Sequence, residues 1–374
     1  MGLKVLHLID SGGLYGAEKM LLALVSEQIK QGLEPMILSA GEPAIEEKPL
    51  EAEARRLGLP ITPWRMKPGL NLPEARKIIT WAREQGYDLM HSHGYKFNIL
   101  AGIWPRRMRL PLVATLHGYV RAPRFTKMWL YELMDRLVLR RMQGVILVNE
   151  PMRVELESVL QGSKAHVIPN GVDIADIERR AEEEPASDMG HFLSTHSPVI
   201  LGVGRLSREK AFERLIEAFA AIRDHYPQAG LLVVGEGKQR GELESLVQQY
   251  SLDTDVLMPG FQENVPALMA RADALVIPSR TEGLPITLLE AMTLKLPVIA
   301  SAVGAMPEVL ENGENGWIVQ EPFPESIRDS LHECLKNQEP RSYKVQKAYQ
   351  KVHRIYSSRA MATAYSDIYQ QVAG

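Results

Sequence analysis

Residues 274–292, ALVIPSRTEGLPITLLEAM, predict a strand, a loop and a helix of an α/β protein. The apolar run 274–277 predicts a buried strand, and the turn 283–285 exposes backbone N–H groups before a helix. Glu282 then lies in the loop and Glu290 within the helix, at different depths of one expected pocket. Carboxylates accept hydrogen bonds from paired hydroxyls, so one could hold sugar hydroxyls and the other a ribose. A capping acid and a solvated glutamate are the alternative for this pair alone.

The same alternation of strand and helix extends outward over the whole chain. Helix-length amphipathic patterns, such as 18–31, 72–85 and 212–224, separate short apolar runs. This rhythm predicts an α/β fold with a doubly wound parallel sheet in each half. The expected strands are 4–9, 35–38, 89–91, 112–116, 145–148, 166–168, 199–203, 231–234, 256–258, 274–277 and 297–300.

The two sheets are divided by residues 173–198, where the apolar rhythm lapses into acid-rich sequence with proline and serine. This segment predicts an interdomain linker, and we place the domains at 1–180 and 181–354. The tail 342–372 is helical in composition. Its last part, about 355–374, either caps its own domain or packs back onto the first one.

Composition agrees with two or three globular domains, because the 374 residues are 45% hydrophobic and 24% charged. There is no signal-peptide pattern at the N-terminus and no apolar run of about 20 residues that could span a bilayer. The only cysteine, Cys334, cannot form an internal disulfide. We therefore expect a cytoplasmic protein.

The net charge of −3 hides a basic segment: residues 53–164 contain 19 Lys and Arg against 9 Asp and Glu. Solvated helix faces are one interpretation, and a surface for anionic lipid or a phosphorylated acceptor is the other. The strip 124–131, RFTKMWLY, together with Arg140 and Arg141, has two equally good interpretations. It could make peripheral contact with the inner face of a membrane, or it could be a packed helix with snorkelling arginines. Nucleic acid is not an expected partner, because no recognition motif accompanies the charge.

Two further loops of the second half follow expected strands. Residues 202–210, GVGRLSREK, place Arg205 and Lys210 before a helix, where two cations can neutralise a leaving diphosphate. Residues 235–241, GEGKQRG, lack the spacing of a dinucleotide motif and are interpreted as a wall of a nucleotide pocket. An exposed basic turn and a simple strand-to-helix turn are the respective alternatives.

In the first half, the loop 10–18, DSGGLYGAE, follows the first strand and could approach a phosphate closely. A plain flexible loop explains it equally well. His93 and His117 each end an expected strand, and either could donate a hydrogen bond to a sugar hydroxyl or an acceptor. No acidic Asp-x-Asp cluster or helical histidine pair supplies a recognisable cation site, so we expect no metal.

These motifs, in this order, resemble the retaining glycosyltransferases of family four. The likeness covers nearly the whole chain and includes 169–173, PNGVD, and 297–301, PVIAS. It implies the GT-B fold, two facing Rossmann-like domains with a cleft between them. It also implies transfer of a sugar, with retention, from a nucleotide diphosphate sugar, by default UDP-linked, to a glycan, lipid-linked or small-molecule acceptor in envelope or exopolysaccharide synthesis. The first domain would bind the acceptor and the second the donor.

The likeness also assigns residues. Arg205 and Lys210 would grip the diphosphate, Glu282 with Gly283 and Leu284 would hold the sugar, and Glu290 would bind the ribose. His117 would lie near the reacting sugar, and turnover would need no metal or cofactor. The remaining expected contacts are Gly13, Gly16, Gly235 and Glu236 for the donor, and His93 and Tyr15 for the acceptor.

Two residues depart from the family pattern, because Ala211 and Ala305 stand where glycine is common. They put the turn at the phosphate loop and the loop beyond the pocket in doubt. A GT-B nucleotide-sugar epimerase and a non-catalytic sugar-nucleotide-binding protein are the alternative functions.

Overall fold

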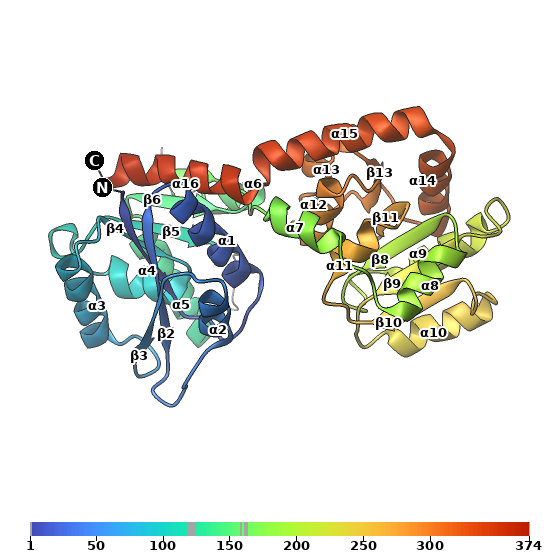
Figure 1. Ribbon diagram of the computed structural model, residues 1–374. Helices are drawn as coiled ribbons and strands as arrows, with labels where there is room; N and C mark the ends of the chain where they lie inside the picture. The colour runs from blue at the N-terminus through green and yellow to red at the C-terminus, as the bar shows by residue number, and fades with distance from the viewer. Residues whose placement is uncertain (1, 118–124, 158, 161–163, 374) are drawn as a thin grey trace. The chain divides into compact units, whose positions relative to one another are not determined.

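The computed structural model describes residues 2–117, 125–157, 159–160 and 164–373. The chain divides into two compact units, residues 1–171 with 355–374 and residues 172–354. The first unit thus ends at Gly171, whereas the sequence placed the boundary after residue 180. Each unit is an α/β sandwich around one parallel sheet (Figure 1).

The first unit contains a seven-stranded parallel sheet in the order β3-β2-β1-β4-β5-β6-β7. Its interior strands β1, β4, β5 and β6 are buried on both faces, which explains their continuous apolar sequences. Helices α1 and α16 pack together on one face, while α3, α4 and α5 cover the other. The elements are β1 Lys4–Ile9, α1 Gly16–Lys30, β2 Glu34–Gly41, α2 Pro49–Arg56, β3 Ile61–Arg65, α3 Leu72–Glu84, β4 Leu89–Ser92, α4 Tyr95–Gly102, η1 Arg106–Met108, β5 Leu112–Leu116, α5 Lys127–Leu139, β6 Gly144–Leu147, α6 Glu150–Leu156, β7 Ala165–Val167 and α16 Ser358–Ala373.

The second unit contains a six-stranded parallel sheet in the order β10-β9-β8-β11-β12-β13. Helix α9 packs with α10 and α14, and α7 packs with α11 and α12. The elements are α7 Ile174–Ala181, α8 Ser187–Thr195, β8 Val199–Val203, α9 Phe212–Ile222, β9 Gly230–Val234, α10 Arg240–Gln249, β10 Val256–Gly260, α11 Val265–Met269, β11 Ala274–Ile277, α12 Ile286–Thr293, β12 Val298–Ser301, α13 Met306–Val309, η2 Glu311–Gly313, β13 Trp317–Val319, α14 Pro324–Lys336 and α15 Gln338–Ile355.

The segment 173–198 is not the irregular linker that the sequence predicted. Apart from short connecting turns it forms helices α7 and α8, and the whole segment belongs to the second unit. The Asp173 side chain caps α7 by accepting a hydrogen bond from the Asp176 N–H at 3.1 Å. Each helix buries only one or two apolar side chains, Ile177 in α7 and Met189 with Phe192 in α8. With so few apolar residues, neither helix shows a helical periodicity that could be recognised in the sequence.

Candidate active site

Strands β8 and β11 are neighbours at the centre of the second sheet, and the chain leaves them in opposite directions. From β8 it proceeds to β9 and β10 on one side, and from β11 to β12 and β13 on the other. Ligands of open α/β sheets bind beyond the carboxyl ends of strands at such a switch point. The loops after β8 and β11 carry Lys210 and Glu282, so the expected donor residues lie at the place that the topology favours.

The Lys210 ammonium forms an ion pair with Oε1 of Glu282 across this switch point. Ser279 donates a hydrogen bond to the same oxygen at 2.7 Å. The two side chains are partly covered, with 24% and 10% of their surfaces exposed. Because both contacts converge on Oε1, Oε2 of Glu282 has no partner within the described part of the chain. The pair therefore offers a cation and an unoccupied carboxylate oxygen at one point.

The loops after β8 and β9 interlock through their backbones. A side chain at Gly235, which has a φ of +144°, would come 1.9 Å from the Gly204 carbonyl oxygen. One at Gly237 would come 2.2 Å from the Leu206 oxygen. The Leu206 N–H in turn donates to the Glu236 carbonyl at 2.9 Å. These glycines are therefore required for close packing of the two loops, whether or not a ligand approaches them.

The turn that carries Glu282 is held from the loop after β12. The Ala305 N–H donates to the Gly283 carbonyl at 2.9 Å. Gly304 has a φ of +60°, and a Cβ there would lie 2.2 Å from the Glu282 carbonyl oxygen. Glycine at 304 thus allows the two loops to touch behind the predicted sugar-binding turn.

The other expected donor residues have different surroundings. Arg205 is exposed and forms no salt bridge among the residues that the structure describes. Glu236 pairs with Arg240 at 2.7 Å. Glu290 is partly buried in α12, and Leu284 is partly buried ahead of that helix.

The two departures from the family pattern have different consequences. Ala211 has a φ of +53°, a left-handed conformation that favours glycine, so this alanine is strained by roughly 1 kcal/mol. The turn between β8 and α9 is therefore kept although alanine stands where glycine is common. Ala305 has an ordinary right-handed conformation, with a φ of −82°. No glycine is needed there.

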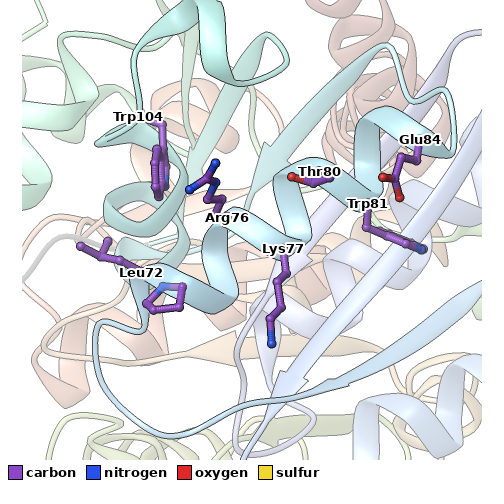
Figure 2. A pocket seen from close by; sticks show the side chains of 8 residues that line it. Leu72, Arg76, Lys77, Thr80, Trp81, Glu84 and Trp104 are labelled. Atoms are coloured by element: carbon purple, nitrogen blue, oxygen red, sulfur yellow. The ribbon is translucent and has the colours of Figure 1, made fainter.

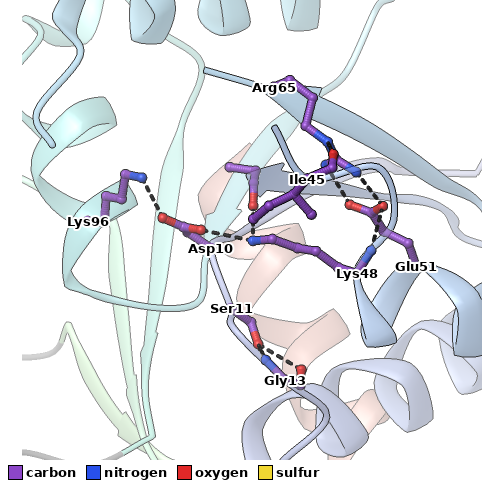
Figure 3. A network of polar contacts seen from close by, with 9 residues as sticks. Asp10, Ser11, Gly13, Ile45, Lys48, Glu51, Arg65 and Lys96 are labelled. Atoms are coloured by element: carbon purple, nitrogen blue, oxygen red, sulfur yellow. Dashed lines mark hydrogen bonds and ion pairs between the residues drawn. The ribbon is translucent and has the colours of Figure 1, made fainter. Parts of the chain in front are cut away.

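In the first unit, the glycine loop after β1 is anchored at Asp10 (Figure 3). Lys48 contacts Oδ1 of Asp10 at 3.0 Å, and Lys96 pairs with Oδ2. Burial raises the pKa of Asp10, but the Lys96 and Lys48 ammonium groups outweigh it, so the net pKa is lowered. Next to it, Ser11 Oγ accepts from the Gly13 N–H at 3.2 Å. This ion triad fixes the start of the loop.

The tip of that loop is more open. Tyr15 is 72% exposed, and its backbone N–H donates to Glu18 at 2.8 Å, at the start of α1. Gly13 lies against the Tyr15 ring, since an added Cβ would come 2.5 Å from it, whereas Gly16 has open space.

The two predicted histidines are connected. Nδ1 of His93 lies 3.3 Å from Nε2 of His117, at the carboxyl ends of β4 and β5. Burial lowers the pKa of His117 to about 4 and that of His93 well below its usual value. His93 is 6% exposed, and its other ring nitrogen contacts His7 at 2.9 Å. The sequence analysis predicted that His93 contacts the acceptor, but both of its ring nitrogens contact other histidines of the protein, His7 and His117.

Among the described residues, His7, His91 and His93 have ring nitrogens within 4.8 Å of one another and so merit a test as metal ligands. His91 Nδ1 contacts the Tyr369 hydroxyl at 2.6 Å, and its Nε2 contacts Thr115 at 2.8 Å. The nitrogens of His7 and His93 are likewise paired. These rings are satisfied by hydrogen bonds, so they fit a polar core better than a metal site; a metal-free enzyme remains a prediction.

Several site residues have no assigned role in the sequence analysis: Ser279, His7, and the Asp10, Lys48 and Lys96 triad. Ser279 could have been found, because it is a hydroxyl directly after a strand in the segment that carries Glu282. The others could not, because their partners are far along the chain.

Comparison with known proteins identifies the family of the chain. Residues 186–351 match the model for glycosyl transferases group 1, and residues 15–176 match that for Glycosyltransferase Family 4. N-acetyl-alpha-D-glucosaminyl L-malate synthase of Bacillus anthracis is 25% identical over 309 residues, which cover 82% of this chain and 80% of that protein. UDP-Gal:alpha-D-GlcNAc-diphosphoundecaprenol alpha-1,3-galactosyltransferase of Escherichia coli is 26% identical over 249 residues, 64% of each chain.

Solved structures show the same architecture. Anabaena Alr3699/HepE, determined in complex with UDP, aligns with a TM-score of 0.79 at 21% identity, covering 99% of this chain and 100% of that one. At this identity the likeness shows the fold, which is GT-B. Because the two family models match the two halves in order, the chain belongs to the group 1 glycosyltransferases of GT4 type.

Proposed function

We propose that this enzyme transfers a sugar from a nucleoside diphosphate sugar bound by its second unit, with retention of configuration and without a metal. The observation that carries the proposal is the Lys210–Glu282 ion pair at the switch point between β8 and β11. It presents the cation that a diphosphate needs beside the acceptor oxygen that sugar hydroxyls need. The exposed Arg205 is available as the second cation.

In the proposed reaction, the bond between the anomeric carbon and the diphosphate oxygen breaks, and the acceptor oxygen bonds to that carbon. The acceptor proton passes to the departing phosphate. Negative charge grows on the diphosphate as the sugar takes on oxocarbenium character, so fixed cations stabilise the transition state. A bound diphosphate would share the Lys210 ammonium with Glu282, whose Oε2 accepts from a sugar hydroxyl. His117 is the proposed contact of the first unit with the reacting sugar.

We propose UDP as the nucleotide. Structures of Anabaena Alr3699/HepE contain UDP and UDP-glucose, and the Escherichia coli relative is named for UDP-Gal. The relatives' acceptors include a malate and a lipid diphosphate. A glycan, a lipid-linked sugar and a small hydroxy acid are therefore the acceptor classes to screen, with envelope or exopolysaccharide synthesis as the proposed setting.

A direct test combines donor screening with matched variants. UDP-sugars that raise the melting temperature are assayed for transfer to each acceptor class in the presence of EDTA. Lys210→Ala and Glu282→Gln should each lower kcat/KM by at least about 100-fold, the effect of losing one transition-state contact of about 3 kcal/mol. Lys336→Ala, which removes a cation from the last turn of α14, is the control and should be normal.

Near-normal activity of purified Lys210→Ala and Glu282→Gln would contradict the proposed donor site. Loss of transfer with EDTA, restored by a divalent ion, would contradict the metal-free mechanism. Epimerised donor with no transfer product would favour the epimerase instead.

We further propose that the first unit contacts anionic membrane lipid at the inner face. No helix within the described residues has the length and apolarity to cross a bilayer. Helix α5, however, exposes an apolar row, with Leu130 52%, Leu133 42% and Leu137 55% exposed. The basic pair Arg140 and Arg141 follows this helix. An exposed apolar row beside cations is the pattern of an interfacial helix.

A groove of about 610 Å³ along α3 adds to this surface (Figure 2). Arg76 and Lys77 lie on the helix, and Trp81 and Trp104 line the same groove. Helix α4 packs against both α3 and α5, so the groove and the apolar row are on the same face of the first sheet. Tryptophan and basic side chains are both enriched at membrane interfaces. Arg124 of the strip predicted from sequence lies outside the described residues.

Flotation with vesicles of phosphatidylcholine and phosphatidylglycerol tests the contact. Binding should rise with anionic lipid and fall for the double variant Leu130→Glu with Leu133→Glu. Leu57→Glu, at an exposed position outside α5, is the control and should float normally. Flotation that does not depend on the anionic lipid content of the vesicles would disprove the proposal.

A further inference from the structure

A chain of four polar side chains crosses the core of the first unit and ends at His117. Gln28 of α1 places Oε1 2.9 Å from Nε2 of His7 in β1. Nδ1 of His7 lies 2.9 Å from Nε2 of His93, and Nδ1 of His93 lies 3.3 Å from Nε2 of His117. Gln28 and His7 are fully buried, and His93 is 6% exposed. We call these four residues the histidine chain.

The three rings of the histidine chain are neutral at pH 7. Burial lowers the pKa of His7 and of His117 to about 4, and it lowers that of His93 well below the usual value. A neutral imidazole has one N–H donor and one acceptor nitrogen. Each ring that accepts on one side must therefore donate on the other, so the direction of the first hydrogen bond sets all the rest.

Gln28 supplies that direction. Its Oε1 can only accept, so His7 carries its proton on Nε2 and accepts at Nδ1. In this orientation the other end of the amide is paired as well, because Nε2 of Gln28 donates to the Tyr369 hydroxyl oxygen at 3.4 Å. His93 then donates from Nε2 to His7 and accepts at Nδ1. His117 consequently donates from Nε2 to His93, and its own Nδ1 keeps a lone pair.

Nδ1 of His117 is a buried atom with no hydrogen-bond partner in the part of the chain that the structure describes. An unpaired buried acceptor is costly, by roughly 1–3 kcal/mol, and such a cost is expected where a ligand completes the pairing. His117 follows β5, at the same edge of the sheet as the glycine loop after β1.

We propose that Gln28, His7 and His93 are positioning residues that hold His117 as its Nε2–H tautomer, so that Nδ1 accepts a hydrogen bond from a substrate hydroxyl. The inference rests on the proposed function, in which His117 contacts the reacting sugar. It specifies the chemistry of that contact: the substrate group facing Nδ1 is a donor, and an ether or carbonyl oxygen at the same place is rejected.

A double-mutant cycle in the full-length enzyme separates this tautomer effect from a structural one. Gln28→Met removes the oxygen that sets the direction while nearly preserving side-chain length. It should lower kcat/KM by more than about tenfold, because a wrong tautomer is costly even when geometry is intact. In a His117→Asn background, where there is no tautomer to set, Gln28→Met should add no further loss.

Thr115→Val is the matched control. Thr115 is fully buried and contacts His91, which is linked to the histidine chain only indirectly among the described hydrogen bonds, through the Tyr369 hydroxyl that Gln28 also contacts. Its effect on activity should be small and equal in both backgrounds. An equal loss from Gln28→Met in both backgrounds would overturn the inference, because it would be merely structural.

Selective ¹⁵N-histidine NMR gives a readout independent of activity. The His117 signal, identified by its absence from His117→Asn, should show a protonated Nε2 and an unprotonated Nδ1. In Gln28→Met the two nitrogens should move toward average values, while Thr115→Val leaves them unchanged. A protonated Nδ1 in the parent enzyme, or stoichiometric zinc in the purified protein, would overturn the assignment.

The two proposals can fail separately. Normal transfer by His117→Asn would remove the proposed role of His117 at the sugar. Loss of transfer by His117→Asn, with normal transfer by Gln28→Met, would retain that role and refute the histidine chain.

Discussion

Asp135 is a carboxylic acid enclosed in the first unit, 3% exposed, with the Asn98 amide 2.8 Å from Oδ1. Burial raises its pKa to about 7. The hydrogen bond that Asn98 donates acts in the opposite direction and lowers the pKa, but the effect of burial is larger. Because the folded pKa exceeds the ordinary aspartate value of 3.8, the stability that this group contributes is fully present below pH 3.8 and is lost as the pH rises through 7.

We therefore expect Asp135→Asn to stabilise the protein at high pH. By linkage the gain over the parent should approach about 2–4 kcal/mol at pH 8 and shrink toward zero near pH 4. Thermal unfolding of both proteins across this range measures it. Asp188→Asn, which replaces an exposed carboxylate, is the control. A stability difference that does not grow with pH would contradict the buried-acid interpretation.

Gly304 supports the proposed sugar-binding turn through its lack of a side chain. In Gly304→Ala, the Cβ would lie 2.2 Å from the Glu282 carbonyl oxygen and 2.6 Å from that of Gly283, so this turn must move. We expect a loss of kcat/KM of at least about tenfold, since small displacements of positioning groups are costly. Gly241→Ala, with no atom within 4 Å, should be active and slightly more stable. Equal activity of the two variants would show that the turn does not position substrate.

For single residues, the sequence identified the charged side chains of the proposed donor site, but it did not identify the hydrogen-bond partners of the buried histidines. Lys210 and Glu282 follow neighbouring strands, and the shared edge of a parallel sheet brings them together, as their positions suggested. The histidine chain could not be inferred, because Gln28 is one polar residue on an amphipathic helix and meets His7 only after the sheet forms. The direction of the hydrogen bonds in the histidine chain depends on which atoms are paired in the folded protein. The spacing of the residues along the sequence does not reveal it.

Among the elements, strands with continuous apolar sequence were predicted most accurately. The expected ranges 4–9, 112–116, 199–203 and 274–277 coincide with β1, β5, β8 and β11. All four are interior strands, covered on both faces. The missed strands β3 and β13 lie at sheet edges, where β3 is only partly buried and β13 has three residues. Edge position weakens the apolar signal on which the prediction depends.

Helix α7, in the segment first taken for a linker, depends on its cap. Asp173 pairs with the Asp176 N–H, and the helix buries Ile177 against the second unit. We expect Asp173→Ala to destabilise the protein by about 1 kcal/mol, as a lost N-cap does, whereas Asp173→Asn keeps an acceptor and most of the stability. Urea unfolding of the three proteins measures this. Equal loss in both variants would mean that the carboxylate charge, rather than the cap, matters.

The whole molecule consists of two units with separate cores, joined where the chain passes from 171 to 172 and from 354 to 355. Division into two sheets followed from the repeated strand rhythm. The return of the chain was left open by the sequence, because a helical tail carries no information about the sheet it covers. Burial of Tyr365 and Tyr369 in the core beneath α16 explains why the last helix belongs to the first unit.

Two separate cores predict that UDP, which lacks the sugar that His117 is proposed to contact, stabilises the second unit only. UDP at about 100 times its dissociation constant should add about 2.7 kcal/mol to the unit that binds it. Trp317 lies in the second unit, while the other tryptophans, at 64, 81, 104 and 129, lie in the first. In a Trp317→Phe variant, tryptophan fluorescence therefore follows the first unit alone. We expect UDP to raise the temperature of one calorimetric transition without changing the temperature of the fluorescence transition. In Lys210→Ala the calorimetric increase should disappear. Transitions that move together would show that the two units unfold as one, since UDP would then stabilise residues that it does not touch.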